Sequence, residues 1–380
     1  MATPDHRPRV NIIYPYFPHY RRPVMLALRD SEAFDYRFWA DDREHEGIKM
    51  CASAPELPIS PLRFIVKGKR MEISGLWPAL SDPMAKAVII AGNANMVSTW
   101  YAACAARALG KRVLFWAHGW LRPEPRMKSL LRRRYFGLAH HVLVYGERAR
   151  LLAERAGFDP ERITVIYNSL DVEASVRLRE TLTAKPLDAI RAGLGLPSDR
   201  PVLVATARLT EVCRFDLLID AAAQLQSRHQ LRPFLVLIGE GPQSEALAAQ
   251  ARRRNVDLVL PGAIYDEARL APYLYAADMA VSPGKVGLTA MHALVYGTPV
   301  ATHGDFDYQM PEAEAVVDGV NGCLFTRDDA NDLAKRLHLW LRGQRERDAI
   351  RAACIASIET TYTPANQRRL IDGALKRLLP

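Results

Sequence analysis

The chain has 380 residues, of which 49% are hydrophobic and 24% charged, so it can bury sizeable cores and is not an intrinsically disordered protein. At about 150 residues per domain, this length predicts two domains, and the 22 Gly and 25 Pro follow no period that would indicate a solenoid or a fibre. The net charge of +9 favours an anionic partner but does not choose among nucleic acid, a membrane surface and a phosphorylated substrate.

The N-terminal residues are polar and mixed in charge, without the apolar stretch of a secretory signal. No segment approaches the ~20 apolar residues that a bilayer crossing needs. The five Cys are far apart, odd in number and without a Cys-x-x-Cys pair, which argues against a disulfide framework and a structural zinc site. We therefore expect a cytoplasmic protein, either in solution or peripherally bound at the inner face of the cell membrane.

Short runs rich in β-branched residues recur in two series, separated by stretches of helical pattern. Strands that alternate with helices in this way predict parallel sheets covered on both faces, and two series predict two doubly wound α/β domains. The runs are Val10–Tyr14, Ala87–Ile90, Val113–Trp116, His141–Val144 and Ile163–Ile166, then Val202–Thr206, Phe234–Ile238, Val256–Leu260, Met279–Ser282 and Pro299–Thr302.

The stretch between the two series has Pro, Gly and charged residues but no clear strand, which suits a connection with one helical excursion. We therefore predict a first domain over 1–170 and a second over 171–362, with a linker near 171–200. Residues 363–380 begin with Thr-Pro-Ala and carry apolar residues at helical spacing, so they predict a terminal helix that could pack back on the first domain.

In open parallel α/β sheets, ligands bind beyond the carboxyl ends of the strands. The turn after Met279–Ser282 contains Gly284 and Gly287 and leads into a helix, so the amides of Val286, Gly287, Leu288 and Thr289 are expected to face an anion such as a diphosphate. A turn that merely connects two elements is the alternative.

The turn after Val202–Thr206 carries two arginines at positions that suit a phosphate clamp. Arg208 follows the strand and Arg214 precedes a helix, and a guanidinium can grip phosphate oxygens with two parallel donors. An ordinary solvated surface charge is the competing interpretation. After Phe234–Ile238 comes Gly-Glu-Gly-Pro, short of a full dinucleotide fingerprint, and it predicts a close approach of backbone to ligand at Gly241.

The order and spacing of several short motifs between Tyr145 and Phe325 resemble glycosyltransferase family 4, and the later segment resembles members that build bacterial surface polysaccharides. The motifs are Tyr167-Asn168-Ser169-Leu170-Asp171, Ala207-Arg208-Leu209, Gly239-Glu240-Gly241-Pro242, Ala276-Ala277-Asp278, Val286-Gly287-Leu288-Thr289-Ala290, Tyr296-Gly297-Thr298-Pro299-Val300 and Asp318-Gly319-Val320-Asn321-Gly322.

The resemblance implies a retaining enzyme of the GT-B architecture, in which two Rossmann-like domains face each other across a cleft. It implies a UDP- or GDP-linked sugar as donor on the second domain. The expected acceptor is a hydroxyl of a glycan or of a polyprenyl-diphosphate-linked molecule. No metal and no further cofactor are expected.

Three positions depart from the family pattern. Gly284 and His292 stand where the family usually has two Glu, and Cys213 stands where it has a phosphate-binding Lys. Lys285 and Arg214, each one residue further along, are expected to replace charge at the donor, and His292 to hydrogen-bond ribose hydroxyls. The expected donor-binding set is Arg208, Arg214, Gly241, Lys285, Val286, Gly287, Leu288, Thr289 and His292.

Two further side chains are predicted to take part in catalysis with Arg208. His118 ends a strand of the first domain in Phe115-Trp116-Ala117-His118-Gly119-Trp120, and the resemblance places it between donor sugar and acceptor, where an imidazole can donate or accept a hydrogen bond. Glu312, at a probable helix start, is the next carboxylate expected to face the cleft. The structural alternatives are a satisfied core histidine and a first-turn acid that complements the helix dipole.

The acceptor wall is expected to include residues from three strand ends of the first domain. An aromatic packing plug is the alternative for the first of these turns. The predicted acceptor residues are His19, Tyr20, Arg21, Asn93 and Trp120.

Residues 126–138 place Met127, Leu130, Leu131 and Leu138 at helical spacing among cations. Such a helix can lie on anionic lipid, with each basic residue contributing on the order of 1 kcal/mol near the surface, or it can turn the same stripe toward the core. Asp305 and Asp307 form an acidic pair, but two carboxylates rarely complete a divalent metal site.

The predicted reaction is transfer of a sugar from a nucleoside diphosphate sugar, with attack by the acceptor on the same face. A sugar-nucleotide epimerase or hydrolase is one alternative. A catalytically silent relative that binds a nucleotide sugar or partner enzymes is another, motivated by Gly284, His292 and Cys213. Nucleic-acid binding ranks last because no helix-turn-helix, zinc or aromatic RNA-binding motif is present.

Overall fold

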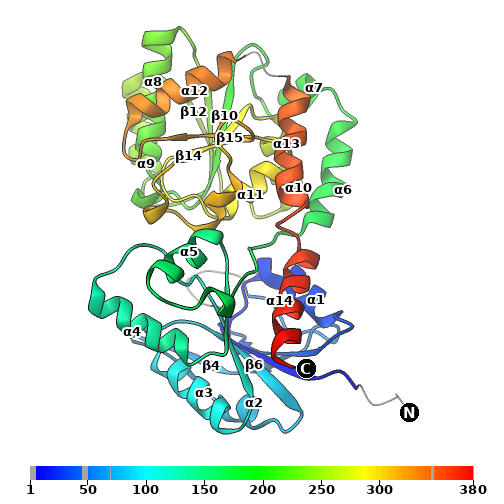
Figure 1. Cartoon of the computed structure of the whole chain (residues 1–380). Coiled ribbons are helices and arrows are strands. Elements are labelled where there is room, and N and C mark those ends of the chain that lie inside the picture. The colour runs from blue at the N-terminus through cyan, green and yellow to red at the C-terminus, as the bar shows by residue number, and fades with distance from the viewer. Residues whose placement is uncertain (1–5, 45–49, 69, 344–345, 380) are drawn as a thin grey trace. The chain divides into compact units, whose positions relative to one another are not determined.

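The computed structural model describes residues 6–44, 50–68, 70–343 and 346–379. The chain divides into two compact units: unit 1 is Met1–Asp171 with Thr363–Pro380, and unit 2 is Val172–Tyr362. In Figure 1 unit 1 contains both the blue-to-green first part of the chain and the red terminal helix.

Unit 1 is built on a seven-stranded sheet in the order β3-β2-β1-β6-β7-β8-β9, in which all neighbouring strands are parallel. An antiparallel pair, β4 and β5, forms a separate small sheet. The strands are β1 Arg9–Tyr16, β2 Asp35–Asp41, β3 Ile59–Pro61, β4 Arg63–Lys67, β5 Arg70–Ser74, β6 Ala85–Ala91, β7 Arg112–Ala117, β8 His141–Val144 and β9 Ile163–Val165.

Both faces of this sheet are packed. Strand register aligns Ile12 with Ile89 and Ile89 with Leu114, and these three belong to one apolar cluster. Because successive side chains of a strand point to opposite faces, the next residue of each strand joins a second cluster on the other face. The helices are α1 Arg22–Arg29, α2 Trp77–Ser81, α3 Val97–Ala108, α4 Arg126–Gly137, α5 Glu147–Arg155 and α14 Pro364–Leu378, with 3-10 helices at His19–Arg21 and Pro160–Arg162.

The terminal helix α14 is an integral part of unit 1 and lies beside α1 (Figure 1). The Thr363 side chain caps it by accepting from the Asn366 amide at 3.1 Å, and Pro364 occupies its first turn. Ile371 and Leu375 are buried in the cluster shared with α1. Asp372 accepts hydrogen bonds from Ser31 Oγ at 2.9 Å and from Tyr36 Oη at 2.6 Å.

Unit 2 has a six-stranded parallel sheet in the order β12-β11-β10-β13-β14-β15. Its strands are β10 Val202–Thr206, β11 Phe234–Ile238, β12 Asp257–Gly262, β13 Met279–Ser282, β14 Val300–His303 and β15 Gly322–Phe325. Its helices are α6 Val172–Thr183, α7 Leu187–Gly193, α8 Phe215–His229, α9 Ser244–Arg254, α10 Glu267–Ala276, α11 Leu288–Val295, α12 Ala330–Arg342 and α13 Arg347–Glu359, with 3-10 helices at Glu211–Cys213, Phe306–Tyr308 and Pro311–Ala315.

The region predicted as a linker is folded into unit 2. Residues 172–193 form two helices, α6 and α7, where one helical excursion was expected. The buried Arg191 of α7 pairs with Asp278 at 2.8 Å and also donates to the Ala276 carbonyl at 3.0 Å. These contacts fix α7 to the segment that leads into β13, so this stretch is not an open connection.

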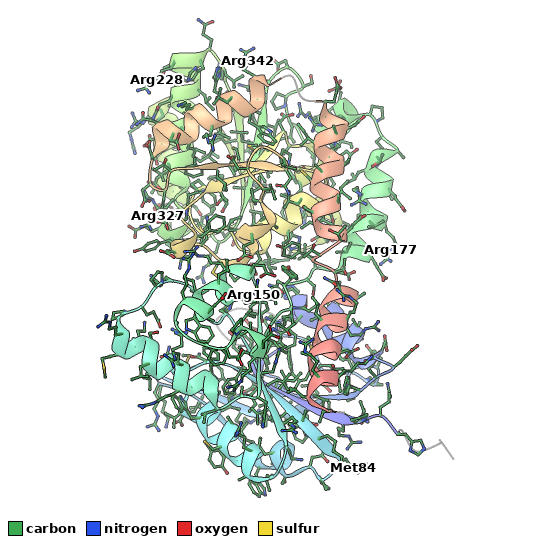
Figure 2. All side chains as sticks on the ribbon, in the orientation of Figure 1. Met84, Arg150, Arg177, Arg228, Arg327 and Arg342 are labelled. Carbon is green, nitrogen blue, oxygen red and sulfur yellow. The ribbon has the colours of Figure 1, made fainter. Side chains whose placement is uncertain are left out.

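The predicted fold class is confirmed: each unit is a parallel sheet of the Rossmann-like type. Figure 2 shows Arg228 at the end of α8 and Arg342 at the end of α12 extending outward from unit 2. Within the described residues, no helix has the length and apolar character required to cross a membrane.

Candidate active site

Two strand-to-helix turns of unit 2 lie next to each other because β10 and β13 are neighbouring parallel strands. Leu203 pairs with Met279 and Val204 with Ala280, so both strands end at the same edge of the sheet. Thr289 Oγ1 donates to the Thr206 carbonyl at 2.8 Å, which ties the first turn of α11 to the end of β10. The site is therefore built from the segments 207–214 and 283–289.

Two cations in these turns are available to a ligand. The side chains of Arg208 and Lys285 are exposed, and neither forms a hydrogen bond or an ion pair with another described residue. Both extend from a sheet edge where parallel α/β proteins bind their ligands. Two uncompensated cations here create a positive potential that suits a diphosphate.

The amides at the start of α11 divide into one that is occupied and three that are not. The Val286 N–H donates to Gln309 Oε1 at 2.9 Å, so the expectation that it faces an anion is wrong. The N–H groups of Gly287, Leu288 and Thr289 have no hydrogen-bond acceptor among the described residues. With the positive end of the helix dipole behind them, these three can bind phosphate oxygens.

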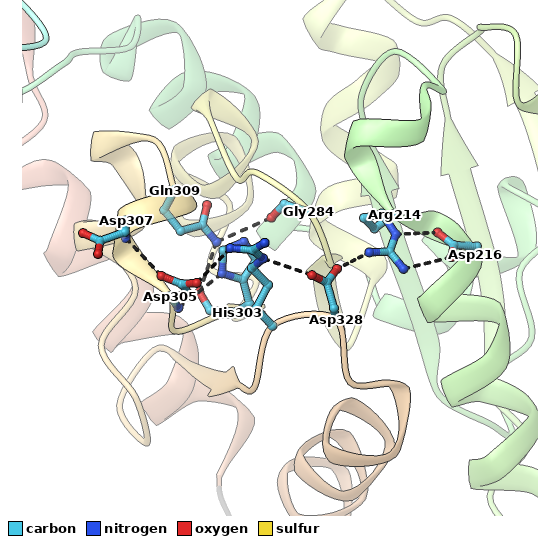
Figure 3. Close-up of polar contacts among 9 residues, drawn as sticks. Arg214, Asp216, Gly284, His303, Asp305, Asp307, Gln309 and Asp328 are labelled. Atoms are coloured by element: carbon cyan, nitrogen blue, oxygen red, sulfur yellow. Dashed lines mark hydrogen bonds and ion pairs between the residues drawn. The ribbon is translucent and has the colours of Figure 1, made fainter. Parts of the chain in front are cut away.

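Gln309 holds the Gly-rich turn and was not predicted from the sequence. Its buried Nε2 donates to the His303 carbonyl at 3.1 Å and to the Gly284 carbonyl at 3.4 Å (Figure 3). The same nitrogen donates to Thr302 Oγ1 at 2.8 Å. Its Oε1 accepts from Val286. One amide side chain therefore bonds both the Gly284 carbonyl and the Val286 N–H of this turn. Nothing in the local sequence around Gln309 indicates this role.

The departure at Gly284 has a steric cause. A Cβ at this position would lie 2.1 Å from the Val212 carbonyl oxygen and 3.0 Å from Cys213 Cα. The Gly284 N–H also donates to the Cys213 carbonyl at 3.0 Å. The two site turns thus pack backbone to backbone, and this packing excludes the family's Glu side chain here.

The two glycines of the Gly-x-Gly after β11 also allow two turns to pack closely against each other. A Cβ on Gly239 would lie 1.9 Å from the Ala207 carbonyl oxygen, and one on Gly241 would lie 2.3 Å from that of Leu209. The backbone at Gly241 thus packs closely against the neighbouring turn, and its predicted approach to a ligand stays a prediction.

Arg214 does not form the free clamp that was expected. It adopts a left-handed conformation (φ 53°) just before α8 and pairs with Asp216 at 3.2 Å and with Asp328. Figure 3 shows its guanidinium between these two carboxylates. Its charge is therefore already compensated within unit 2.

The acidic pair near β14 also belongs to a local charge network. Arg327 contacts Asp328 at 3.0 Å and Asp305 at 2.9 Å. Asp305 in turn accepts from the Asp307 amide at 3.2 Å, which caps the 3-10 helix that follows. The described residues contain no cluster of three potential metal ligands. Pairing and capping account for Asp305 without a metal.

Cys213 and His292 occupy family positions but face other groups. Cys213 Sγ donates to the Arg208 carbonyl at 3.2 Å. His292 Nδ1 lies 3.4 Å from Glu267 Oε1, which also accepts from Tyr296 Oη at 2.8 Å. Burial disfavours ionised Glu267, but the contacts from His292 and Tyr296 outweigh it and lower the pKa of this carboxyl. His292 Nε2 forms no hydrogen bond with a described residue, and its contact with a ribose hydroxyl stays a prediction.

Glu312 is buried, with 4% of its surface exposed, in the 3-10 helix Pro311–Ala315. The expectation of a carboxylate that faces an open cleft is not supported by this burial. Most residues of that short helix are buried with it and pack against α11. A role in positioning α11 suits this location better than direct contact with a sugar.

In unit 1, His118 follows β7 and its ring packs 4.9 Å from the ring of Tyr145. The residue keeps more than a third of its surface exposed. Desolvation by neighbouring side chains and the Arg21 cation lower the pKa of His118 to about 4, so the imidazole is neutral at pH 7. Gly119 has φ 68°, and a Cβ there would lie 2.9 Å from Val144 Cγ1, so this tight turn requires glycine.

The predicted acceptor residues differ in accessibility. His19 and Tyr20 are exposed on the 3-10 helix after β1, and Arg21 is half-buried. Asn93 uses its oxygens inside its own turn, accepting from Thr99 Oγ1 at 2.9 Å through its carbonyl and from the Asn95 amide at 3.0 Å through Oδ1.

Trp120 is not an acceptor residue in this structure. Only 3% of its surface is exposed, and its ring lies 4.6 Å from that of Phe136 and 5.1 Å from that of Phe158. It belongs to the apolar core of unit 1, because the turn after His118 directs it inward.

Helix α4 presents apolar and basic side chains to solvent together. Met127 is 78% exposed and Leu131 56% exposed, so the alternative in which this stripe faces the core is wrong for them. The helix is held by Tyr135 and Phe136 in its last turns, which are buried. Arg132 donates to the Gly119 carbonyl at 3.0 Å, which connects α4 directly to the turn after His118.

Comparison with known proteins gives two family matches that lie one after the other along the chain. The family described as glycosyltransferase family 4 matches residues 73–174, and the one described as glycosyl transferases group 1 matches residues 187–355. The first match lies in unit 1 except for its last three residues and the second lies in unit 2, so the site turns lie in the group 1 match.

Curated relatives are D-inositol 3-phosphate glycosyltransferases. The chain is 31% identical to one from Catenulispora acidiphila over 229 residues, which cover 56% of this chain and 50% of that protein. It is 29% identical to one from Thermomonospora curvata over 263 residues, which cover 66% of this chain and 60% of that protein. The chain thus matches about half to three fifths of the length of these relatives.

Solved structures with a similar fold have low sequence identity. Anabaena HepE in complex with UDP gives a TM-score of 0.71 at 16% identity, covering 97% of this chain and 100% of that one. The lipopolysaccharide outer core galactosyltransferase WaaB gives 0.69 at 16% identity, covering 98% and 100%. These structural similarities show the fold, whereas the two family matches, together with the curated relatives, show the family. The chain belongs to the family 4 glycosyltransferases and has the GT-B fold.

Proposed function

We propose that this protein transfers a sugar from a nucleoside diphosphate sugar to a hydroxyl acceptor, with retention of the anomeric configuration. One observation carries the proposal: the uncompensated cations Arg208 and Lys285 share a sheet edge with the open amides of Gly287, Leu288 and Thr289. Cations and oriented N–H groups at a helix start are the groups that bind a diphosphate.

The same groups can also accelerate the reaction. Negative charge grows on the diphosphate as the glycosidic bond breaks, so donors aimed at it stabilise the transition state more than the ground state. Gly284 stands where a carboxylate is usual, and Glu312 is buried. We therefore propose same-face attack by the acceptor, without a glycosyl-enzyme intermediate.

The proposed donor is UDP- or GDP-linked. Among proteins of this fold, Anabaena HepE has been solved with UDP and with UDP-glucose, which makes a uridine nucleotide the first candidate. No metal or further cofactor is included in the proposal.

The proposed acceptor is a glycan or a polyprenyl-diphosphate-linked molecule presented at an anionic membrane surface. The exposed apolar side chains of α4 lie among the exposed cations Arg126, Lys128 and Arg133, a combination that complements anionic lipid. Arg132 links this helix to the turn of His118, the neutral imidazole proposed to contact the acceptor hydroxyl. A role in bacterial surface polysaccharide synthesis follows from this acceptor class.

A ligand panel tests the donor assignment. Thermal unfolding is measured with UDP, GDP and their sugars, because a ligand at 100 times its Kd stabilises the folded state by about 2.7 kcal/mol. We expect one nucleotide series to raise the Tm of the native chain and to lose this effect in Arg208→Ala. If no nucleoside diphosphate raises the Tm, the proposed function is wrong.

A catalytically silent relative is the second candidate, favoured by the charge compensation of Arg214 and by the glycine at position 284. Product analysis with the stabilising donor separates the candidates. Transfer to a hydroxyl acceptor supports the transferase, whereas stable nucleotide binding without turnover over a donor and acceptor panel supports the silent relative. Release of free sugar without acceptor indicates a hydrolase, and a changed sugar that stays nucleotide-linked indicates an epimerase.

A further inference from the structure

The guanidinium of Arg21 is surrounded by three aromatic rings at the strand ends of unit 1. Its Cζ lies 5.4 Å from the ring centroid of Tyr14, 5.1 Å from that of Trp116 and 5.3 Å from that of Tyr145. These rings come from β1, from β7 and from the residue after β8. Residues far apart in the sequence thus form an aromatic cage around one cation.

Among the described residues, the Arg21 side chain has one hydrogen-bond partner. One Nη donates to Tyr145 Oη, and Arg21 forms no ion pair with a described carboxylate. Neighbouring arginines differ in this respect, because Arg22 pairs with Glu56 and Arg29 with Asp30. A guanidinium carries five N–H donors, so most of those of Arg21 lack an acceptor in the part of the chain that the structure describes.

Among the described residues, Arg21 therefore lacks an anionic acceptor for its N–H donors. Aromatic faces attract a cation, but they do not accept in-plane N–H groups as a carboxylate or phosphate does. Charges withdrawn from water are normally paired with an opposite charge. A planar guanidinium with N–H donors that lack a described acceptor fits an oxyanion with two adjacent oxygens.

We propose that Arg21 binds an anionic group of the acceptor, a phosphate ester or a carboxylate, next to the hydroxyl that is glycosylated. This inference rests on the proposed function, since it assigns unit 1 to the acceptor. The ring of His118 lies 4.9 Å from that of Tyr145, which also receives the Arg21 hydrogen bond. The anion site and the proposed hydroxyl contact are thus joined through one side chain.

The test uses the full chain with Arg208→Ala and Lys285→Ala, so that phosphate binding at the donor turns does not contribute. Glycerol 3-phosphate, acetate and neutral glycerol are titrated while the aromatic NMR signals of Tyr145 are followed, assigned with Tyr145→Phe. We expect glycerol 3-phosphate or acetate to bind saturably and glycerol not to bind. The ligand that saturates identifies the anion as a phosphate ester or a carboxylate.

Adding R21Q should weaken anion binding by about 10-fold or more, the loss expected for a charge-assisted hydrogen bond of about 1.5 kcal/mol or above. The matched control is R22Q, which removes the adjacent surface cation and should leave binding unchanged. R21K keeps the positive charge but not the planar guanidinium. If R21Q does not fold, weaker anion binding by a folded R21K chain still tests the proposal.

The proposal is overturned if no anion saturates the Tyr145 signals, or if binding in both R21K and R21Q equals that in R22Q. Nucleotide binding is measured separately on the chain with Arg208 and Lys285 intact. A failure of the Arg21 site is thereby distinguished from a failure of the donor site.

Discussion

Arg208 and Arg214 belong to the same turn, yet their surroundings differ. The Arg208 side chain has no partner among the described residues, whereas the Arg214 guanidinium lies between Asp216 and Asp328. A cation that is already paired adds little potential at a neighbouring phosphate, because the two acids offset its charge. The residue type alone does not reveal this difference, since Asp328 lies 114 positions along the chain.

We therefore predict unequal effects of two matched substitutions. Arg208→Ala should lower kcat at saturating donor by about 100-fold or more, by analogy with the loss of one transition-state donor. Arg214→Ala should lower it much less. Steady-state kinetics of both variants against native enzyme measures this, and near-native turnover of Arg208→Ala would remove Arg208 from the site.

The site residues show what a sequence can predict at this scale. The positions of the exposed cations Arg208 and Lys285 were predictable because each lies only a few residues after the end of a strand. Trp120 was predicted wrongly because the glycine before it reverses the chain and directs the indole into the core. The Val286 amide was predicted wrongly because its acceptor, Gln309, comes from a distant loop.

At the scale of elements, the start of α11 is positioned by contacts from two other segments. Gln309 holds the turn from one side, and the backbone at Val212 and Cys213 packs against Gly284 from the other. The predicted Gly-rich turn is thus correct in position, but its rigidity comes from long-range packing and not from its own sequence.

Removal of the Gln309 side chain should therefore loosen the donor site. Gln309→Leu leaves the buried Val286 N–H without an acceptor, which costs about 1–3 kcal/mol for each group left unsatisfied. We expect a lower Tm and a raised KM for the donor with a smaller change in kcat. Gln309→Glu keeps the acceptor oxygen but not the Nε2 donor and should be intermediate, so equal nucleotide binding in all three proteins would contradict this role.

Helix α4 yields a prediction about membranes. Met127→Ser with Leu131→Ser should reduce cosedimentation with vesicles that contain anionic lipid, because two exposed apolar side chains lose their insertion energy. The control is Val97→Ser with Tyr101→Ser on α3, an exposed pair with the same spacing. Raised salt should weaken native binding. Equal cosedimentation of the two double variants would exclude α4 as the contact.

At the scale of the whole molecule, buried histidines connect stability to pH. His141 begins β8 and is buried, with Nε2 2.7 Å from Thr164 Oγ1. Desolvation and the nearby cations Arg377 and Arg162 lower its pKa to about 4. Between pH 6.5 and 4 the unfolded chain binds a proton that the folded chain does not, so stability is lost as pH falls through this window.

We predict that His141 alone contributes about 2 kcal/mol of this loss at pH 5. Urea unfolding of the native chain and of His141→Gln at pH 7.5 and pH 5 measures the difference in pH dependence. The control is His19→Gln, an exposed histidine on the same unit. His303 is buried in unit 2, and its pKa is also lowered by desolvation, so it adds to the loss in both variants. Parallel pH dependence in all three proteins would contradict the assignment to His141.

The alternation of strands and helices, and with it the fold class, was determined by the sequence because apolar periodicity is local. β8, β10, β11 and β13 have the predicted bounds. β2, β3, β4, β5 and β15 were not predicted. β2 carries Arg37 between acidic ends, and β15 begins with Gly322, whose missing Cβ allows an approach to the Val300 carbonyl. Sheet order was likewise not readable from local patterns, because pairing joins distant segments.

The motifs indicated the family and the strand ends where we propose that a ligand binds, since both depend on short-range spacing. Only the tertiary structure decided which groups there are available. It paired Arg214, occupied the Val286 amide, buried Trp120 and gathered three rings around Arg21. The physical reason is that a charge or an N–H group is free or satisfied according to its neighbours in space, and in this chain many of those neighbours are distant in sequence.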